Sequence, residues 1–182
     1  MIDLASSIGM SIHNPSIFLV NMDCIFQIVG RKDSGKTLVI ERAVSALKRR
    51  GLTVATVKHT HHEINPSRKD TARFMNAGSD VTILHSNDCA LLWRCSTPDY
   101  LDLIPADVVL VEGFANRDLG KKIVVNDPSD ADRIVKEIVE EASQCKLEAS
   151  VEVFPKQKDK MVYMTLYKLM KKWGIKEVKL LD

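Results

Sequence analysis

Residues 30–37 carry the pattern with the clearest chemical meaning, Gly-Arg-Lys-Asp-Ser-Gly-Lys-Thr, which fits the phosphate-loop pattern G-x-x-x-x-G-K-[ST]. Backbone N–H groups of such a loop bind a phosphate chain at the positive end of a helix dipole. We expect Lys36 to neutralise the outer phosphates and the Thr37 hydroxyl to ligate Mg²⁺. The pattern therefore predicts a nucleoside triphosphate site built from Gly30, Arg31, Lys32, Asp33, Ser34, Gly35, Lys36 and Thr37.

A second chemical element follows at residues 108–112, where four apolar residues end in a carboxylate. This pattern is typical of a Walker B strand, whose acid faces the Mg²⁺ ion or its water ligands at the carboxyl end of the sheet. The acid is Glu112, where Asp is usual, and its longer side chain suits holding a metal-bound water or orienting an attacking water. We therefore expect Thr37 and Glu112 to organise Mg²⁺, with Glu112 as a catalytic group.

The run Lys-His-Thr-His-His that begins at Lys58 is the third element. Three histidines in four residues suggest a metal site, but the ligand spacing of a zinc site is missing, and His61 and His62 face opposite ways if the strand continues. Three interpretations remain, a polar loop at the edge of the sheet, a functional loop without permanent metal, which we favour, and a metal site. The functional interpretation assigns Lys58, His59 and His61 to nucleotide binding. It also assigns Asp70, in the next segment, a catalytic role within a switch around the nucleotide.

The elements that position these groups alternate between strands and helices. An apolar run at residues 25–29 is typical of a buried parallel strand, and after Thr37 the apolar residues adopt helical spacing until Gly51. Strands alternating with helices, with a hairpin inserted at residues 81–93, predict a three-layer α/β fold of the P-loop NTPase class with a mainly parallel central sheet. Further strands are expected at residues 52–57, 108–112, 123–125 and 178–181, and further helices at residues 67–77, 129–142 and 158–173.

Length and composition limit the classes of function. The chain has 182 residues and is most simply one domain, at residues 22–182. The formal net charge of +2 argues against a broad nucleic-acid surface, and no apolar run reaches the length of a membrane span. Four cysteines without a C-x-x-C pair favour reduced thiols and a cytoplasmic location.

The first 21 residues differ in character from the rest. They contain no Lys or Arg, so they lack the basic segment of a signal peptide. Two interpretations are equally compatible with their composition. Either Met22 is the physiological start and the preceding residues are an extension, or residues 16–20 form an extra edge strand.

Several of these segments, taken in order, resemble the molybdopterin-guanine dinucleotide biosynthesis protein B family, MobB. They are the strand and phosphate loop at residues 28–37, Val-Lys-His-Thr-His-His at 57–62, Lys-Asp-Thr at 69–71 with Ala-Gly at 77–78, and Val-Leu-Val-Glu-Gly-Phe at 109–114 followed by Lys-Ile at 122–123. The resemblance covers roughly residues 24–127. Residues 128–182 form a divergent C-terminal part, and Arg68 stands where family members often carry Gly.

This resemblance implies a homodimeric GTP-binding protein with weak GTPase activity, located in the cytoplasm. Such a protein is an adaptor in molybdenum cofactor biosynthesis and assists the MobA-like molybdopterin guanylyltransferase, so the implied partners are that enzyme and molybdopterin, without nucleic acid or membrane. The implied cofactors are GTP and Mg²⁺. The histidine loop and Asp70 would respond to the nucleotide or contact the pterin. Independently of the resemblance, Asn126 and Asp127 follow the short strand at Ile123, and this position makes them the candidates to supply an amide and a carboxylate to the purine edge.

Two other functions remain compatible with the sequence. A small-molecule kinase of the P-loop class needs mobile arginines over the γ-phosphate, and Arg68 and Arg73 are the candidates. A metal-delivery GTPase would use the histidines that follow Lys58.

Overall fold

The computed structural model of the chain describes residues 9–11, 24–145 and 160–179. These residues form two compact units, of which the second is Thr60–Tyr100 and the first comprises the described residues on either side of that segment. The strand proposed at residues 16–20 lies outside the described residues. The single domain predicted for residues 22–182 stays a prediction.

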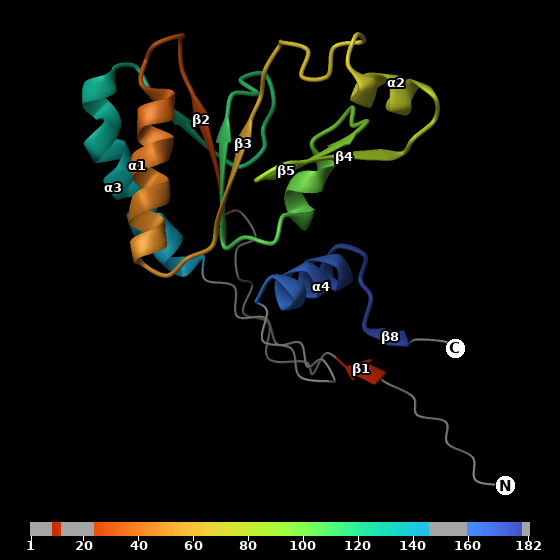
Figure 1. The fold of residues 1–182 in the computed structure, drawn as a ribbon. Coiled ribbons are helices and arrows are strands. Elements are labelled where there is room, and N and C mark those ends of the chain that lie inside the picture. The colour runs from red at the N-terminus through yellow and green to blue at the C-terminus, as the bar shows by residue number, and fades with distance from the viewer. Residues whose placement is uncertain (1–8, 12–23, 146–159, 180–182) are drawn as a thin grey trace, which may run out of the picture. The chain divides into compact units, whose positions relative to one another are not determined.

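A four-stranded parallel sheet forms the centre of the first unit (Figure 1). Its strands occur in the order β3 (Val54–Lys58), β6 (Val108–Glu112), β2 (Ile25–Val29) and β7 (Lys121–Val124). The two central strands, β2 and β6, are almost entirely buried because apolar residues occupy both of their faces. All four strands run in the same direction, so their carboxyl ends meet at one edge of the sheet.

Two helices, α1 (Lys36–Arg49) and α3 (Ala131–Glu141), pack against each other and against one face of this sheet (Figure 1). In α1 the buried residues Val39, Ala43 and Leu47 recur every four positions, which aligns them on one side of the helix. In α3 the buried residues Ile134 and Ile138 repeat this spacing. Phe26, Ile28, Val108 and Leu110 of the sheet complete this apolar core.

Two features of the first unit were not predicted from the sequence. Cys24 and Cys145 form a disulfide across a sequence separation of 121 residues. The prediction of reduced thiols is therefore wrong for these two cysteines, because the fold brings the start of β2 and the end of the α3 region together. Two short turns flank α3, at Pro128–Asp130 and Ala142–Gln144.

The remaining elements of the first unit are α4 (Lys160–Lys172) and the antiparallel pair β1 (Gly9–Ser11) and β8 (Glu177–Lys179). Lys168 of α4 donates hydrogen bonds to the carbonyl oxygens of Ile104 and Ala106. Strand β1 lies within the N-terminal segment, so part of that segment is structured by pairing with β8. No helix in the described part of the chain is long and apolar enough to cross a membrane.

The second unit consists of α2 (Asp70–Asn76) and an antiparallel hairpin of β4 (Val81–His85) and β5 (Cys89–Trp93), joined by a turn at residues 86–88. A short turn at Asp99–Leu103 follows. Helix α2 begins three residues later than the sequence predicted, after Lys69, and no side chain caps its first turn. The α/β fold with a parallel central sheet and an inserted hairpin is confirmed.

Candidate functional site

The phosphate loop connects the carboxyl end of β2 to the first turn of α1. Its two glycines are required by close contacts with the segment that follows β7. A Cβ atom on Gly30 would lie 2.3 Å from the carbonyl oxygen of Val125, and one on Gly35 would lie 2.8 Å from the Cα atom of Pro128. Gly35 also has a φ of 95°, which other residues rarely adopt. The loop therefore packs directly on the residues that end the neighbouring strand.

Several polar groups of this loop suit an anion. Gly35 provides the N-cap of α1 without a side-chain hydrogen bond, and no acidic residue lies in the first helical turn. The N–H groups at this end of the helix are thus available to a phosphate. The hydroxyl of Ser34 is buried and has no hydrogen-bond partner among the described residues. A buried polar atom of this kind is costly unless a ligand or water satisfies it.

The ammonium group of Lys36 folds back along the loop. It donates to the carbonyl oxygens of Gly30, at 3.1 Å, and of Arg31, at 2.5 Å. These bonds place a positive charge beside the N–H groups of the first helical turn. The phosphate-loop residues predicted from the sequence thus lie together in one loop, and their role in nucleotide binding stays a prediction.

Glu112 lies at the carboxyl end of β6 and joins two other predicted residues. The Thr37 hydroxyl lies 3.5 Å from its Oε2 atom, and the Lys58 ammonium lies 3.3 Å from each carboxylate oxygen. The parallel register pairs Lys58 directly with Glu112 on the adjacent strand, which explains the ion pair. The carboxylate is only 15% exposed, so its negative charge is partly shielded from water.

A loop at residues 113–119 follows Glu112 and is held by Gln27, a fully buried residue in the middle of β2. The Gln27 amide nitrogen lies 3.0 Å from the carbonyl oxygen of Gly113 and 2.7 Å from that of Phe114, and the amide oxygen accepts from the Leu119 N–H at 3.3 Å. Phe114 has a φ of 53°, an uncommon conformation for a bulky residue. The loop is therefore fixed in a strained form by a side chain from the strand beneath it.

His59 packs against this loop from the end of β3. Its ring lies 4.3 Å from the Phe114 ring, centroid to centroid, and the backbone N–H of His59 donates to the Glu112 carbonyl oxygen at 2.9 Å. A Cβ atom on Gly113 would lie 3.0 Å from the His59 Cβ, so only glycine leaves room for this imidazole. His59 thus lies in the same cluster as Glu112, and its predicted role in nucleotide binding stays a prediction.

Asn126 and Asp127 follow β7 beside the phosphate loop. The Asp127 carboxylate accepts a hydrogen bond from the Ser129 N–H at 2.9 Å, and this bond lowers the pKa of Asp127 below its usual value. Asp127 is therefore ionised and caps the short turn at Pro128–Asp130. One of its oxygens is occupied by this cap, which limits what it offers to a purine edge.

The other predicted site residues, His61 and Asp70, belong to the second unit. Asp70 is the first residue of α2, 77% exposed at its side chain, and forms an ion pair with Arg73 at 3.2 Å. Arg73 is one of the two arginines that a small-molecule kinase would use over the γ-phosphate, and here it is engaged in this surface ion pair. Among the described residues, no cluster of three or more His, Cys, Asp or Glu side chains is arranged to hold a metal ion.

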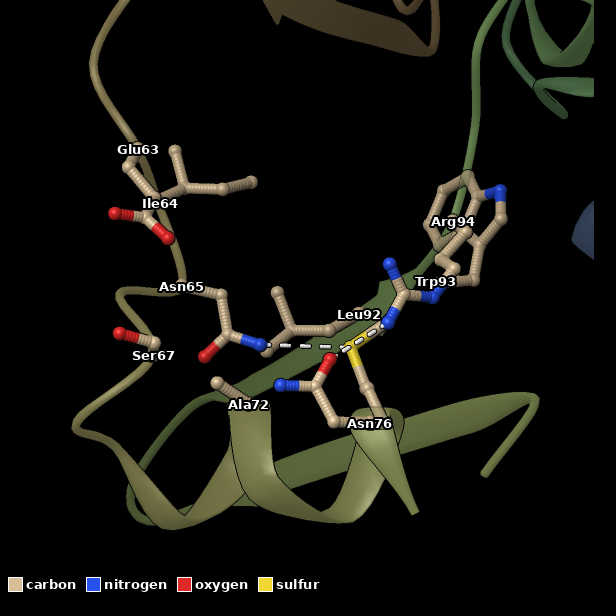
Figure 2. A pocket seen from close by; sticks show the side chains of 10 residues that line it. Glu63, Ile64, Asn65, Ser67, Ala72, Asn76, Leu92, Trp93 and Arg94 are labelled. Carbon is tan, nitrogen blue, oxygen red and sulfur yellow. Dashed lines mark hydrogen bonds between the residues drawn. The ribbon is translucent and has the colours of Figure 1, made fainter. Parts of the chain in front are cut away.

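The second unit contains a pocket of about 230 Å³ between α2, β5 and the segment before α2 (Figure 2). The Arg94 guanidinium donates to the Asn76 side-chain oxygen at 2.8 Å, and Asn65 accepts from the Thr71 hydroxyl at 2.7 Å. Figure 2 shows Arg94 and Asn76 converging on one side and Glu63 and Ser67 on the other. The other lining residues are Ile64, Ala72, Met75, Leu92 and Trp93.

Comparison with known proteins identifies the family. Residues 25–159 match the family model of the molybdopterin guanine dinucleotide synthesis protein B, MobB. The chain belongs to the MobB family. This match contains the phosphate loop, the Lys58 segment and Glu112, and it confirms the resemblance predicted from the sequence. It also extends beyond residue 127, so part of the C-terminal region is covered by the family pattern.

Individual relatives agree with this membership. The molybdopterin-guanine dinucleotide biosynthesis adapter protein of Haemophilus influenzae is 34% identical over 115 residues, which cover 58% of this chain and 65% of that protein. The probable adapter protein of Bacillus subtilis is 30% identical over 120 residues, covering 60% of this chain and 69% of that protein. The chain thus spans less than two thirds of the length of the Haemophilus relative. A solved MobB homologue from Bacillus stearothermophilus is 21% identical, with a TM-score of 0.47 and coverage of 66% of this chain and 98% of that one.

The first unit of this MobB family member contains residues that sequence reasoning missed. Gln27 holds the loop after Glu112, and Val125 and Pro128 press on the phosphate loop. The signal for Gln27 was a single polar residue in an otherwise apolar strand. Val125 and Pro128 contact residues that lie almost a hundred positions away in the sequence, so no local sequence pattern predicts these contacts.

Proposed function

We propose that this MobB family member binds GTP with Mg²⁺ at the phosphate loop and acts as an adaptor in molybdopterin guanine dinucleotide synthesis. One observation carries the nucleotide part of the proposal. Within eight residues the loop combines an uncapped helix N-terminus, the Lys36 ammonium and a buried Ser34 hydroxyl that has no hydrogen-bond partner among the described residues. This donor set matches the chemistry of a phosphate chain.

The residues of the first unit have distinct roles in this proposal. Lys36 and the loop N–H groups hold the phosphates, while Thr37 and Glu112 hold Mg²⁺, which offsets negative charge on the phosphates when bound. Glu112 also orients a water molecule, with its carboxylate kept in place by the Gln27-bound loop that follows it. We expect hydrolysis in the absence of a partner to be slow, well below the 1–100 s⁻¹ typical of kinases.

The adaptor part of the proposal rests on family membership and on the second unit. The curated relatives are named biosynthesis adapter proteins. On the hairpin, Val81 pairs with Trp93 and Ile83 pairs with Leu91, and all four side chains are exposed. Alternation along each strand places these residues on one face, so they form a continuous apolar surface. We propose that this surface serves self-association into a homodimer, which then assists a molybdopterin guanylyltransferase.

Reconstitution of active cofactor tests this function. A purified guanylyltransferase would be supplied with molybdopterin, GTP and Mg²⁺, with and without this protein, and the yield of dinucleotide cofactor measured. We expect a higher yield with the wild-type chain and a reduced gain with Glu112→Gln, while Glu140→Gln on the surface of α3 acts as the control. An equal yield at every GTP concentration, or rapid phosphoryl transfer to a small molecule, would contradict the adaptor function.

A further inference from the structure

We propose that Lys58 makes the site selective for a nucleoside triphosphate over a diphosphate, by exchanging its ion pair with Glu112 for one with the terminal phosphate. The inference rests on the proposed function, since it requires a nucleotide at the phosphate loop. In this proposal Lys58 is a specificity-determining residue outside the phosphate loop, and this role explains its position at the end of β3.

The backbone of Lys58 is held in the parallel sheet, whereas its side chain is largely exposed. Lys58 is the last residue of β3 and pairs in register with Glu112, and the next residue, His59, donates its N–H to the Glu112 carbonyl oxygen at 2.9 Å. The Lys58 side chain is nevertheless 65% exposed, compared with 15% for Glu112. The ammonium group therefore sits on a flexible stem that begins at a fixed point beside the carboxylate.

The ion pair competes with the metal for one carboxylate. Lys58 Nζ and Thr37 Oγ1 both contact the Oε2 atom of Glu112. Thr37 and Glu112 are also the residues that fit Mg²⁺, because both offer oxygen ligands beside the phosphate loop. Two cations on one partly buried carboxylate repel each other, so the mobile ammonium is the one that leaves.

Once it has left Glu112, the Lys58 ammonium would contact the terminal phosphate of the nucleotide. The Lys36 ammonium lies on the carbonyl oxygen of Gly30 within the loop, and the next residue, Thr37, shares the Glu112 oxygen with Lys58. A triphosphate brings an additional anionic group to this place, and a diphosphate does not. Arg31 and Lys32 are exposed loop residues whose side chains have no carboxylate partner in the described structure, so they have no ion pair to exchange.

Calorimetry on Lys58→Gln tests the exchange, because glutamine keeps most of the length of the side chain and removes its charge. GTP and GDP would be titrated at saturating Mg²⁺ into wild type, Lys58→Gln and Lys48→Gln, an exposed lysine in the last turn of α1. We expect Lys58→Gln to bind GTP about tenfold more weakly, equivalent to about 1.4 kcal/mol, with GDP affinity within about twofold of wild type. Lys48→Gln should match wild type for both nucleotides.

A second titration measures the competition directly. Without nucleotide, Mn²⁺ binding followed by electron paramagnetic resonance should be tighter in Lys58→Gln than in wild type, because the Glu112 carboxylate has lost its resident cation. The proposal requires both results. Equal losses for GTP and GDP, or unchanged Mn²⁺ affinity, would overturn it while leaving nucleotide binding by the wild type intact. A wild-type chain that binds neither nucleotide would overturn this inference together with the proposed function.

Discussion

The two units of the molecule differ in how much of their apolar surface they bury themselves. In the first unit the central strands and the inner faces of α1 and α3 enclose a continuous core. In the second unit, Ala72 is a buried apolar residue, while Ile64, Phe74, Ile83, Leu91 and other large apolar side chains are exposed. Since burial of apolar surface is the main stabilising contribution to a fold, the second unit depends more on what binds to it.

This difference separates two kinds of functional surface. In the first unit each site residue is positioned by hydrogen bonds or by register within the same unit, as with Lys58 and Glu112. In the second unit Asp70 forms only an exposed pair with Arg73, which contributes little to stability. The proposed nucleotide site is therefore built from residues of the first unit, whereas the role proposed for the hairpin surface requires a second copy of the chain.

The largest expected effect comes from Lys36→Ala in the proposed nucleotide site. Loss of the ammonium that lies on the phosphate loop should weaken GTP binding by about 100-fold, or about 2.7 kcal/mol, because charge-assisted hydrogen bonds to phosphate are lost. The melting temperature without nucleotide should stay close to that of wild type, since the side chain is not part of the core. Calorimetry and thermal unfolding measure these two quantities.

Lys48→Ala is the matched control for that change, because Lys48 is exposed on the same helix. It should leave GTP affinity unchanged. If Lys36→Ala and Lys48→Ala bound GTP equally well, the phosphate loop would not be the nucleotide site.

Gln27→Leu should have the next largest effect, on the stability of the first unit. The leucine cannot donate to the carbonyl groups of the half-buried residues Gly113 and Phe114, and a buried group left unsatisfied costs roughly 1–3 kcal/mol. Urea unfolding should therefore show a loss of about 1–3 kcal/mol, compared with almost none for Gln144→Leu at an exposed position. A loss no larger than that of the control would mean that Gln27 does not hold the loop.

A smaller effect is expected for the double change Ile83→Ser and Leu91→Ser on the hairpin. These residues form a cross-strand pair and are already 62% and 52% exposed, so the isolated chain should lose little stability. Self-association should weaken by about tenfold, because apolar area is no longer buried between copies. Sedimentation equilibrium measures the dissociation constant, with Phe74→Ser on α2 as the control. Unchanged association would assign the dimer contact to another surface.

Much of the first unit was predictable from the sequence, because local patterns determine it. The apolar run before Gly30, the phosphate-loop spacing and the helical period after Thr37 each describe contiguous residues. The meeting of Thr37 and Glu112 followed from the rule that parallel strands end at one edge of a sheet.

Other features could not be predicted from the sequence, because they depend on contacts between residues that are distant in the chain. The Cys24–Cys145 disulfide joins positions with no spacing rule, and the Gln27 bonds to the 113–119 loop require the strand order of the sheet. The start of α2 was misplaced because Ser67 has the residue type of a helix cap, whereas the chain enters the helix only after Lys69. The functional roles of the predicted site residues, Asp70 and His61 included, stay predictions.

Nucleotide titration of the wild-type protein by calorimetry tests the central claim most directly. With Mg²⁺ present, we predict saturable binding of GTP, weaker binding of ATP, and a loss of GTP affinity when the metal is chelated. Bound GTP at 100 times its dissociation constant should also stabilise the fold by about 2.7 kcal/mol in thermal unfolding. An absence of both heat and stabilisation with GTP and ATP would contradict the account, because the phosphate loop would then bind no nucleotide.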